Sequence, residues 1–497
     1  MTSNAKVSPT QPRLLKDVPQ WDIDTEIAIV GFGGAGACAA IEAADNGASV
    51  SIFELGSDSG GSTIMSSAEI YMGGNGGTPP QKACGYEDSS EDMFNFLMQT
   101  QGPQASEEKT RTYVDGSLDH YDWLTSLGVP FRMTEYTKTR RAIMATTDDC
   151  LLYTGSEKAW PFKQHAKPCP RGHNLHVEGD NGGPELFKHL NASVASRNID
   201  VHFEARALGL VVDEYNRVHG LVVRIDQKEV HVKASKGVIL CAGGFVMNKD
   251  MLQKHAPKLA NGVFEVGNPG DTGSGIQMGM SVGGTAINMH EGFISIPFYP
   301  PDVLTYGIFV NEQGQRFVNE DTYHGRVGSI AMQQLGRRLY LIANVEEMEQ
   351  YDKGNYLGAP YAGVAEESLA ELETELDLPE GSLEACIGLY NRHAEHGKDP
   401  VFHKADEWVK PLTLPLAALD VTPGHGVGIP YFTLGGLDTK ITGEVLTAEG
   451  HVVEGLYAAG RTTCGMVRRG DGYASGMSVG DVTFFGRKAG RAAATAS

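Results

Sequence analysis

The chain has few cysteines and none of them forms a cluster. Its 497 residues include seven cysteines, an odd number that is scattered along the sequence. No Cys-x-x-Cys-His occurs, which excludes a c-type haem attachment, and no cysteine group is spaced for an iron–sulfur centre. Scattered thiols are typical of a reducing compartment, so we expect a cytoplasmic protein.

Long apolar runs and an excess of positive charge are also absent. No run reaches the roughly eighteen apolar residues of a membrane span, and the N-terminus lacks the apolar core of a secretory signal. Lysine and arginine number 41 against 62 aspartates and glutamates, so the formal net charge is −21. This balance argues against binding to nucleic acid or to an anionic membrane. We expect a small-molecule partner instead.

One histidine-rich segment could suggest zinc, but its spacing does not fit. His165, Cys169, His173 and His176 follow the pattern His-x3-Cys-x3-His-x2-His, which matches no standard tetrahedral zinc site. We predict no metal site here. The segment is read instead as a loop that lines the ligand pocket, with Arg171 near substrate or flavin.

A glycine motif after an apolar run is the strongest positive signal. Residues 31–36 read Gly-Phe-Gly-Gly-Ala-Gly and directly follow the apolar residues 27–30. The glycines allow a tight turn and a close approach of the backbone to a pyrophosphate, which the next helix faces with its N-terminal amides. Glu54 ends a second apolar run about twenty residues later, where a carboxylate accepts the ribose hydroxyls of an adenosine. The ligand is therefore NAD or FAD.

Further glycine segments favour FAD. Residues 60–63, Gly-Gly-Ser-Thr, with Ser66 just beyond, extend the first unit as flavoproteins do. Residues 455–460 predict a buried strand that returns to the first sheet, and the helix expected over 476–493 would face the isoalloxazine with its N-terminus. Both ends of the chain thus serve one cofactor.

The intervening chain predicts two kinds of structure. Residues 91–127 have helical periodicity, and the segments 208–212, 218–225 and 230–232 predict a β-meander. A buried strand over 237–240 would then end at Gly243, and residues 269–275, with Asp271, would open a further helix near the flavin. Beyond residue 286 the composition changes, with more aromatic residues and prolines. The Glu-rich residues 366–375 there are interpreted as a solvated helix face.

These segments define the predicted organisation. We expect an α/β protein whose FAD domain is Rossmann-like, of the two-dinucleotide-binding-domain type with a β-meander, and carries an inserted α+β domain. Residues 1–20 are expected to be disordered. Residues 21–285 and 431–497 would form the discontinuous FAD domain, and 286–430 a substrate-binding cap domain.

Taken together, six motifs in order resemble a known family. The glycine motif with Glu54, residues 60–63, Arg-Phe-Val-Asn-Glu at 316–320, Thr-Leu-Gly-Gly at 433–436, residues 455–460 and Phe-Gly-Arg-Lys-Ala-Gly at 485–490 are similar to the FAD-dependent fumarate reductase/succinate dehydrogenase flavoprotein superfamily. The resemblance covers residues 25–491. It implies a reaction that interconverts a saturated carbon pair and an alkene beside a carbonyl, with FAD held non-covalently because no histidine stands at the covalent position.

The resemblance also suggests which residues hold FAD. We expect them to be Gly31, Gly33, Gly34, Ala35, Gly36, Glu54, Gly60, Gly61, Ser62, Thr63, Ser66, Gly243, Asp271, Gly460, Gly476 and Ser478.

The chain departs from the dicarboxylate-using members where they carry cations. His324 follows Tyr323 in place of an arginine, Tyr431 and Phe432 replace a histidine pair, and Tyr473 replaces a C-terminal arginine. Two carboxylates bound without these cations would be buried and unpaired. Aromatic walls with phenols suit a flat, apolar ketone. The Tyr-Ala-Ser-Gly segment at 473–476 is similar to the 3-ketosteroid dehydrogenase branch, nearest its Δ4-(5α) type.

The same resemblance implies roles for individual residues. Tyr473, aided by the backbone near Gly476, would polarise the C3 ketone, and Ser475 with Tyr323 would take the proton from C4 in an order left open. Tyr431 and Phe432 would line the substrate. Alternatives are a Δ1-dehydrogenase, a fumarate- or enoate-type reductase, and a flavin-binding redox sensor without catalysis. The external electron acceptor is not indicated by the sequence.

Overall fold

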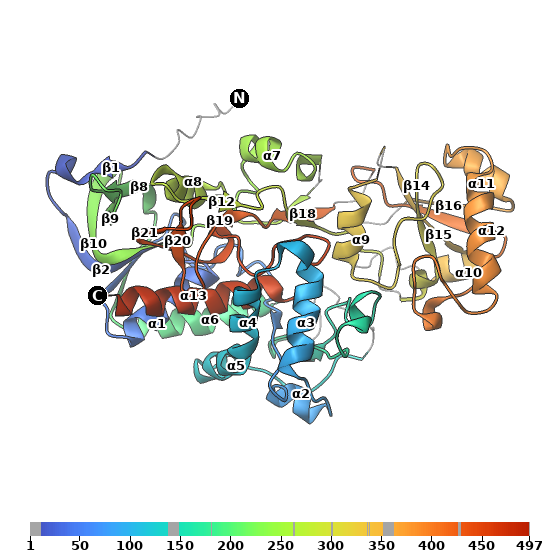
Figure 1. Cartoon of the computed structure of the whole chain (residues 1–497), viewed down its shortest axis with the longest axis horizontal. Coiled ribbons are helices and arrows are strands. Elements are labelled where there is room, and N and C mark those ends of the chain that lie inside the picture. Colours follow the sequence, from blue (N-terminus) through green and yellow to red (C-terminus); the bar gives the residue numbers. More distant parts are fainter. Residues whose placement is uncertain are drawn as a thin grey trace.

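The computed structural model describes residues 11–137, 149–179, 181–261, 264–299, 302–334, 336, 338–350, 362–425 and 429–496. A nine-stranded sheet occupies one end of the molecule and a four-stranded sheet the other (Figure 1). Residues 1–10, part of the segment predicted to be disordered, lie outside the described residues. Among the residues described, no helix has both the length and the apolar character needed to cross a bilayer.

The centre of the large sheet is parallel. Strand β2 (Ile23–Val30) lies between β3 (Val50–Phe53) and β10 (Lys228–Leu240), and β7 (Ile199–His202) follows β3. Helix α1 (Gly34–Asp45) connects β2 to β3 and begins within the glycine motif. All of β3 and the last four residues of β2 are buried, as expected for a parallel sheet covered on both faces. This unit confirms the predicted dinucleotide fold.

A β-meander extends the sheet, with two differences from the prediction. Strands β8 (Arg206–Val212), β9 (Val218–Ile225) and the first part of β10 are antiparallel, as expected. However, β10 continues through an irregularity between Ala234 and Gly237, so the two strands predicted over 230–232 and 237–240 are one. In addition, β1 (Arg13–Leu14) pairs with the edge strand β8. The structure thus has a short strand within the segment predicted to be disordered, since backbone pairing at a sheet edge can include even a polar segment.

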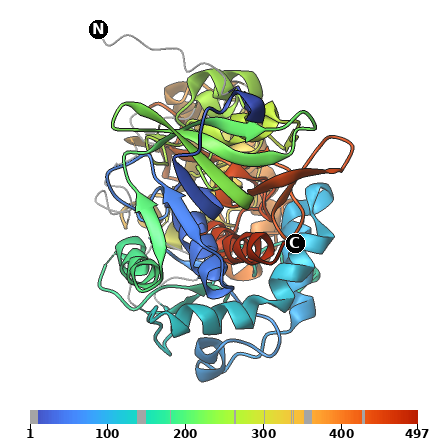
Figure 2. The same ribbon diagram turned by 90° about the vertical axis from the view of Figure 1, so that its left-hand side faces the viewer.

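The C-terminal segment returns to the first sheet. Strand β21 (Val452–Ala458) pairs in parallel with the second half of β10, and helix α13 (Met477–Thr495) lies beside α1 (Figure 2). A Cβ atom on Gly486 would lie 2.6 Å from the carbonyl oxygen of Ala35, and one on Gly490 would lie 2.1 Å from that of Ala39. Only glycine permits such a close crossing of the two backbones.

Helices cover the sheet and form a further layer. Helices α3 (Ser90–Gln101), α4 (Glu107–Asp115) and α5 (Ser117–Ser126) occupy the segment in which helical periodicity was predicted (Figure 1). The side chain of Ser89 accepts a hydrogen bond from the amide of Asp92 at the start of α3. Helices α2 (Pro79–Ala83) and α6 (Gly182–Ala195) complete this part.

The four-stranded sheet lies within residues 286–430. Its antiparallel order is β14 (Ile308–Asn311), β15 (Leu339–Asn344), β17 (Leu416–Asp420) and β16 (Ala362–Glu366). Helices α11 (Leu369–Glu375) and α12 (Ser382–Ala394) lie at this end of the molecule, and α9 (His324–Ala331) lies on the side nearer the large sheet (Figure 1). This combination of an antiparallel sheet and separate helices agrees with the predicted α+β insertion.

Short elements connect these parts. They are β4 (Ile70–Tyr71), β5 (Leu151–Leu152), β6 (Gly172–His173), α7 (Lys249–His255), β11 (Phe264–Glu265), α8 (Ser274–Ser281), β12 (Ala286–Ile287), β13 (Gly292–Ile294), α10 (Val345–Met348), β18 (Pro430–Thr433), β19 (Gly436–Leu437) and β20 (Glu444–Leu446). Strands β11, β18 and β13 form one small sheet, and β4, β6 and β5 form another.

The Glu-rich segment is not wholly a solvated face. Glu373 on α11 is 5% exposed, and its carboxylate accepts hydrogen bonds from the amides of Gly381 (2.7 Å), Leu383 (2.7 Å) and Glu384. These amides belong to the first turn of α12, whose N-terminal N–H groups have no partner within the helix. Glu373 therefore joins the two helices.

We expect Glu373→Ala to lower the free energy of unfolding by about 1–2 kcal/mol, because three α12 amides lose their acceptor. Glu375→Ala is the matched control, since Glu375 is an exposed residue of the same helix. Urea unfolding followed by circular dichroism measures both. Equal stability of the two variants would contradict this capping role.

Candidate active site

A cavity of about 660 Å³ lies at the carboxyl ends of β2, β3, β10 and β21. Ligands in open α/β sheets bind at this edge, where the N-terminus of the next helix also points. Predicted cofactor residues that line the cavity are Gly31, Gly33, Gly34, Ala35, Glu54, Gly61, Ser62, Thr63, Gly243, Asp271 and Gly460. Residues far apart in the sequence thus share one cavity.

Glycine is required at the centre of this cavity. Gly31 has a φ of +101°, and a Cβ atom there would lie 2.4 Å from the carbonyl oxygen of Cys241. Gly243 has a φ of +74°, and its Cβ atom would lie 1.9 Å from Oδ1 of Asp271. The backbone itself therefore forms the cavity wall, an arrangement that fits a pyrophosphate.

Acidic side chains mark two places along the cavity. Glu54 accepts hydrogen bonds from the amides of Phe32 (2.6 Å) and Gly56 (2.7 Å), which fix its carboxylate at the end of β3. Asp271 accepts from the Ser62 hydroxyl at 2.6 Å and from the guanidinium of Arg461 at 2.7 Å. Both positions suit the hydroxyls of a dinucleotide, so the donor set fits FAD.

Five predicted cofactor residues do not line this cavity. Gly36 lies in α1, where a Cβ atom would lie 2.0 Å from the carbonyl oxygen of Gly31. Gly60 pairs with Gly33 in an isolated bridge, and the Ser66 hydroxyl donates to the carbonyl oxygen of Thr63 at 2.7 Å. These three therefore shape the turns around the cavity. Gly476 and Ser478 lie at the start of α13 instead.

Sequence reasoning missed part of the cavity lining. Arg461 follows Gly460 directly and donates to Asp271. Asn268 and residues 205–208 also line the cavity. The position of Arg461 directly after the predicted buried strand was the available signal, because strand ends meet at this edge.

A second feature is a cluster of four aromatic side chains, Phe293, Tyr323, Phe432 and Tyr473. Phe293 is central, with ring centroids 4.9 Å from Phe432, 4.6 Å from Tyr473 and 6.2 Å from Tyr323. The rings of Tyr323 and Tyr473 lie 6.4 Å apart. The structure thus brings together Tyr323, Phe432 and Tyr473, and it adds Phe293, which the sequence did not identify.

Tyr431 does not join this aromatic cluster. Successive side chains on a strand point to opposite faces, so Tyr431 and Phe432 on β18 diverge. Tyr431 is buried in the hydrophobic core of the large sheet, where burial raises its pKa to about 12 and the nearby carboxylate of Glu265 adds to that shift. The expected substrate contact of Tyr431 is therefore corrected to a core position.

The loop over residues 154–157 contacts Tyr323 and fixes its position. The Tyr323 amide donates to the Ser156 hydroxyl at 3.3 Å, and a Cβ atom on Gly155 would lie 2.7 Å from the Tyr323 ring. The carboxylate of Glu157 accepts from the Gly155 amide at 3.0 Å and from the Thr154 amide at 3.1 Å. Glu157 thereby holds the loop that positions the ring.

The segment 473–478 joins the aromatic cluster to the start of α13. Burial raises the pKa of Tyr473, although hydrogen bonds with the side chain and backbone of Ser478 lower it. The Ser475 hydroxyl donates to Oε2 of Glu69 at 2.8 Å. Gly476 adopts the left-handed conformation at the N-cap of α13, with φ at +82°. A backbone donor at a helix start therefore lies beside both hydroxyl groups.

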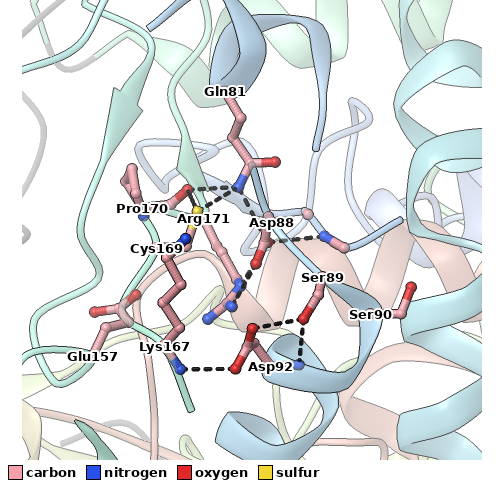
Figure 3. Close-up of polar contacts among 12 residues, drawn as sticks. Gln81, Asp88, Ser89, Ser90, Asp92, Glu157, Lys167, Cys169, Pro170 and Arg171 are labelled. Atoms are coloured by element: carbon pink, nitrogen blue, oxygen red, sulfur yellow. Dashed lines mark hydrogen bonds and ion pairs between the residues drawn. The ribbon is translucent and has the colours of Figure 1, made fainter. Parts of the chain in front are cut away.

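Arg171, which was predicted to lie near substrate or flavin, is buried in an ion pair with Asp88. Its guanidinium donates to both carboxylate oxygens of Asp88 at 2.8 and 2.7 Å, and Gln81 also donates to Asp88 (Figure 3). Arg171 and Asp88 are buried. The adjacent His173 contacts the Thr78 hydroxyl at 2.8 Å. No His, Cys, Asp and Glu group able to hold a metal occurs among the described residues.

Comparison with known proteins agrees with this geometry. The model of the family described as "FAD binding domain" matches residues 26–476. The chain belongs to this family. Its cofactor is accordingly FAD, and the protein is an FAD-dependent oxidoreductase with the fold of the fumarate reductase and ketosteroid dehydrogenase flavoproteins.

Individual relatives span nearly the whole chain. The crystal structure of a 3-ketosteroid-Δ4-(5α)-dehydrogenase from Rhodococcus jostii RHA1 is 38% identical with a TM-score of 0.90, covering 98% of this chain and 100% of that one. A 3-oxo-5-alpha-steroid 4-dehydrogenase from Comamonas testosteroni is 25% identical over 89% of this chain and 94% of its own length. A fumarate reductase (cytochrome) from Shewanella frigidimarina is 28% identical over 99% and 80%, respectively.

We expect Gly31→Ala to raise the dissociation constant of FAD by about tenfold or more, because the left-handed backbone alone costs about 1–2 kcal/mol and the new methyl group meets Cys241. Gly47→Ala is the matched control: Gly47 also has a positive φ, of +86°, but nothing lies within 4 Å of its Cβ position. Fluorescence of released FAD measures both variants. Loss of FAD from the control alone would contradict this explanation.

Proposed function

We propose that this protein is a dehydrogenase that introduces a C4–C5 double bond into 5α-3-ketosteroids. The observation that carries the proposal is the cluster of Phe293, Tyr323, Phe432 and Tyr473 directly beside Ser475 and the start of α13. Flat apolar walls with two phenols suit a steroid nucleus bearing a ketone. The similarity to two steroid 4-dehydrogenases supports this substrate class.

Each polar residue of the cluster has a distinct task in the proposed reaction. Tyr473 donates its hydroxyl to the C3 ketone, helped by the backbone of Gly476, and so stabilises enolate character. Ser475 and Tyr323 lie on the side of C4 and take its proton. When bound, FAD supplies the oxidation by accepting at N5 the hydride that leaves C5.

A dicarboxylate fits this cluster poorly. Arg461 approaches it, with its guanidinium 5.4 Å from the Phe432 ring, but this guanidinium is already paired with Asp271 at 2.7 Å. Moving this guanidinium to a substrate would leave the buried carboxylate of Asp271 without its cation. An uncharged ketone needs no such exchange.

The proposal includes the organisation of the chain. Residues 21–285 and 431–497 hold FAD non-covalently, and 286–430 form the cap over the substrate. The cap contributes Tyr323 and Phe293, whereas Tyr473 and Ser475 come from the FAD part. An external acceptor must reoxidise the flavin, and we place the enzyme in the cytoplasm.

Incubation of the purified protein with 5α-androstane-3,17-dione and an artificial electron acceptor tests the proposal. We expect a 4-ene-3-ketone, identified by NMR and mass spectrometry. A 1-ene product would instead identify a Δ1-dehydrogenase. Absence of turnover, together with oxidation of succinate or reduction of fumarate, would contradict a steroid function.

We expect Tyr473→Phe and Tyr323→Phe each to lower turnover of this steroid at least about tenfold with FAD retained, because each removes a hydroxyl from the reacting groups. Tyr431→Phe is the matched control, since that phenol points to the opposite face of β18. Steady-state kinetics with the flavin absorbance as a loading check measures all three. A variant with an unchanged rate removes its residue from the mechanism.

A further inference from the structure

A buried carboxyl group, Glu69, lies directly behind Ser475. Its Oε2 atom accepts the Ser475 hydroxyl at 2.8 Å, and the residue is only 2% exposed. Its other oxygen, Oε1, has no hydrogen-bond partner among the described residues. A half-satisfied buried carboxyl group is costly to keep, and its contact with Ser475 distinguishes Glu69 from the other buried polar groups.

The surrounding backbone holds this carboxyl group in place. Glu69 precedes β4, and the amide of the following Tyr71 donates to the carbonyl oxygen of Gly476 at 3.0 Å. A Cβ atom on Gly476 would lie 3.3 Å from the carbonyl carbon of Glu69. On the other side, a Cβ atom on Gly172 would lie 2.3 Å from Oε1 of Glu69. Two glycines thus leave space for the carboxyl group and keep it against Ser475.

The charged and titratable groups around Glu69 come from several elements. Burial raises the pKa of Glu69 to about 8, the hydrogen bond from Ser475 opposes the shift, and the carboxylate of Glu157 increases it. Tyr473 faces Glu69 from the start of α13. Tyr71 on β4 lies 3.4 Å from the guanidinium of Arg171, which is neutralised by Asp88. No cation therefore compensates Glu69 directly among these neighbours.

We propose that Glu69 is the proton acceptor behind Ser475, so that the C4 proton leaves the substrate through the pair Ser475–Glu69. The proposal rests on the proposed function. A serine hydroxyl is too weak a base to remove this proton by itself, and an adjacent carboxylate in hydrogen-bond contact supplies the missing basicity.

The step balances without a further reactant. The C4–H bond breaks, and its electron pair forms the second bond between C4 and C5. The released proton binds Oγ of Ser475 as the hydroxyl proton moves to Oε2 of Glu69. The hydride leaving C5 is taken up by FAD, the oxidant of the proposed function. Glu69 thus ends protonated, and it returns its proton to solvent before the next turnover.

The sign of the pH dependence follows from this role. Glu69 must be ionised to accept the proton, so turnover is low well below pH 8 and rises as the pH passes through about 8. Tyr323 lies on the cap side of the cluster and keeps its place beside C4. It then orients the substrate or shares the proton with Ser475.

Glu69→Gln tests the proposal, because the amide keeps the shape and the contact with Ser475 but accepts no proton. We expect turnover of the 5α-3-ketosteroid to fall by about a hundredfold or more, and the rise near pH 8 to disappear. FAD content and steroid affinity should change little. Combined with Ser475→Ala, the substitution should cause no further loss, since both residues serve one step.

Infrared spectroscopy gives a readout that does not depend on turnover. A carboxylic C=O band should be lost from the wild-type protein between pH 7 and 9 and be absent from Glu69→Gln. Glu69→Asp replaces this test if the amide variant does not fold. Its carboxyl group is one methylene further from Ser475, so we expect turnover to be lower than in the wild type but still to rise with pH. Glu371→Gln, an exposed carboxylate on α11, is the control for a general effect of charge.

The outcomes separate the two proposals. Failure of the wild-type protein to oxidise the steroid would overturn the proposed function. Steroid oxidation by the wild type with an unchanged rate and pH profile in Glu69→Gln would overturn the role of Glu69 alone. A wild-type rate that does not change near pH 8, or a Glu69 band that persists through pH 9, would also overturn it.

Discussion

The close crossing of α1 and α13 determines the geometry of the whole site. Gly486 and Gly490 bring the α13 backbone against Ala35 and Ala39, so the position of α13, with Gly476 at its N-cap, is fixed relative to the glycine turn before α1. Any side chain at these two positions would separate the helices. The cavity that fits FAD and the hydroxyls of Tyr473 and Ser475 would then move apart, because the first depends on α1 and the second on α13.

A second contact extends this arrangement toward the substrate. The Tyr71 amide bonds to Gly476, which aligns β4 with the start of α13 and brings Glu69 against Ser475. The opposite wall includes Tyr323 of the inserted segment, which contacts the loop over residues 154–157 that Glu157 holds in place. The site is thus assembled from three separate parts of the chain. Each part is rigid for a reason of its own: a glycine crossing, a short sheet and a carboxylate-bound loop.

Relatives in this family include both fumarate reductases and steroid dehydrogenases, and the present chain illustrates how one fold serves different substrates. The dinucleotide unit needs only a backbone cradle and a few polar groups, which leave the substrate side free to vary. In the proposed function, the replacement of cations by Tyr473, Phe432 and their aromatic neighbours suits an apolar ketone in place of a dianion. The proposed reaction also requires a base, and the proposed role of Glu69 behind Ser475 would meet that need.

Much of this protein could be predicted from local patterns. The glycine turn, the strands around it and Glu54 depend on backbone constraints within a single strand–helix–strand unit. The substitutions at His324, Phe432 and Tyr473 could be identified by their motifs. What the local pattern did not contain were long-range neighbours. Tyr431 and Phe432 are adjacent in sequence yet face different cores, and Glu69 and Ser475 are far apart yet share a hydrogen bond. Residue order alone determined the first strand–helix–strand unit, with its glycine turn and Glu54, because the contacts within that unit are local. Only the tertiary structure decided which phenol faces the aromatic cluster and which carboxyl group meets the serine, because strand pairing and helix packing set those distances.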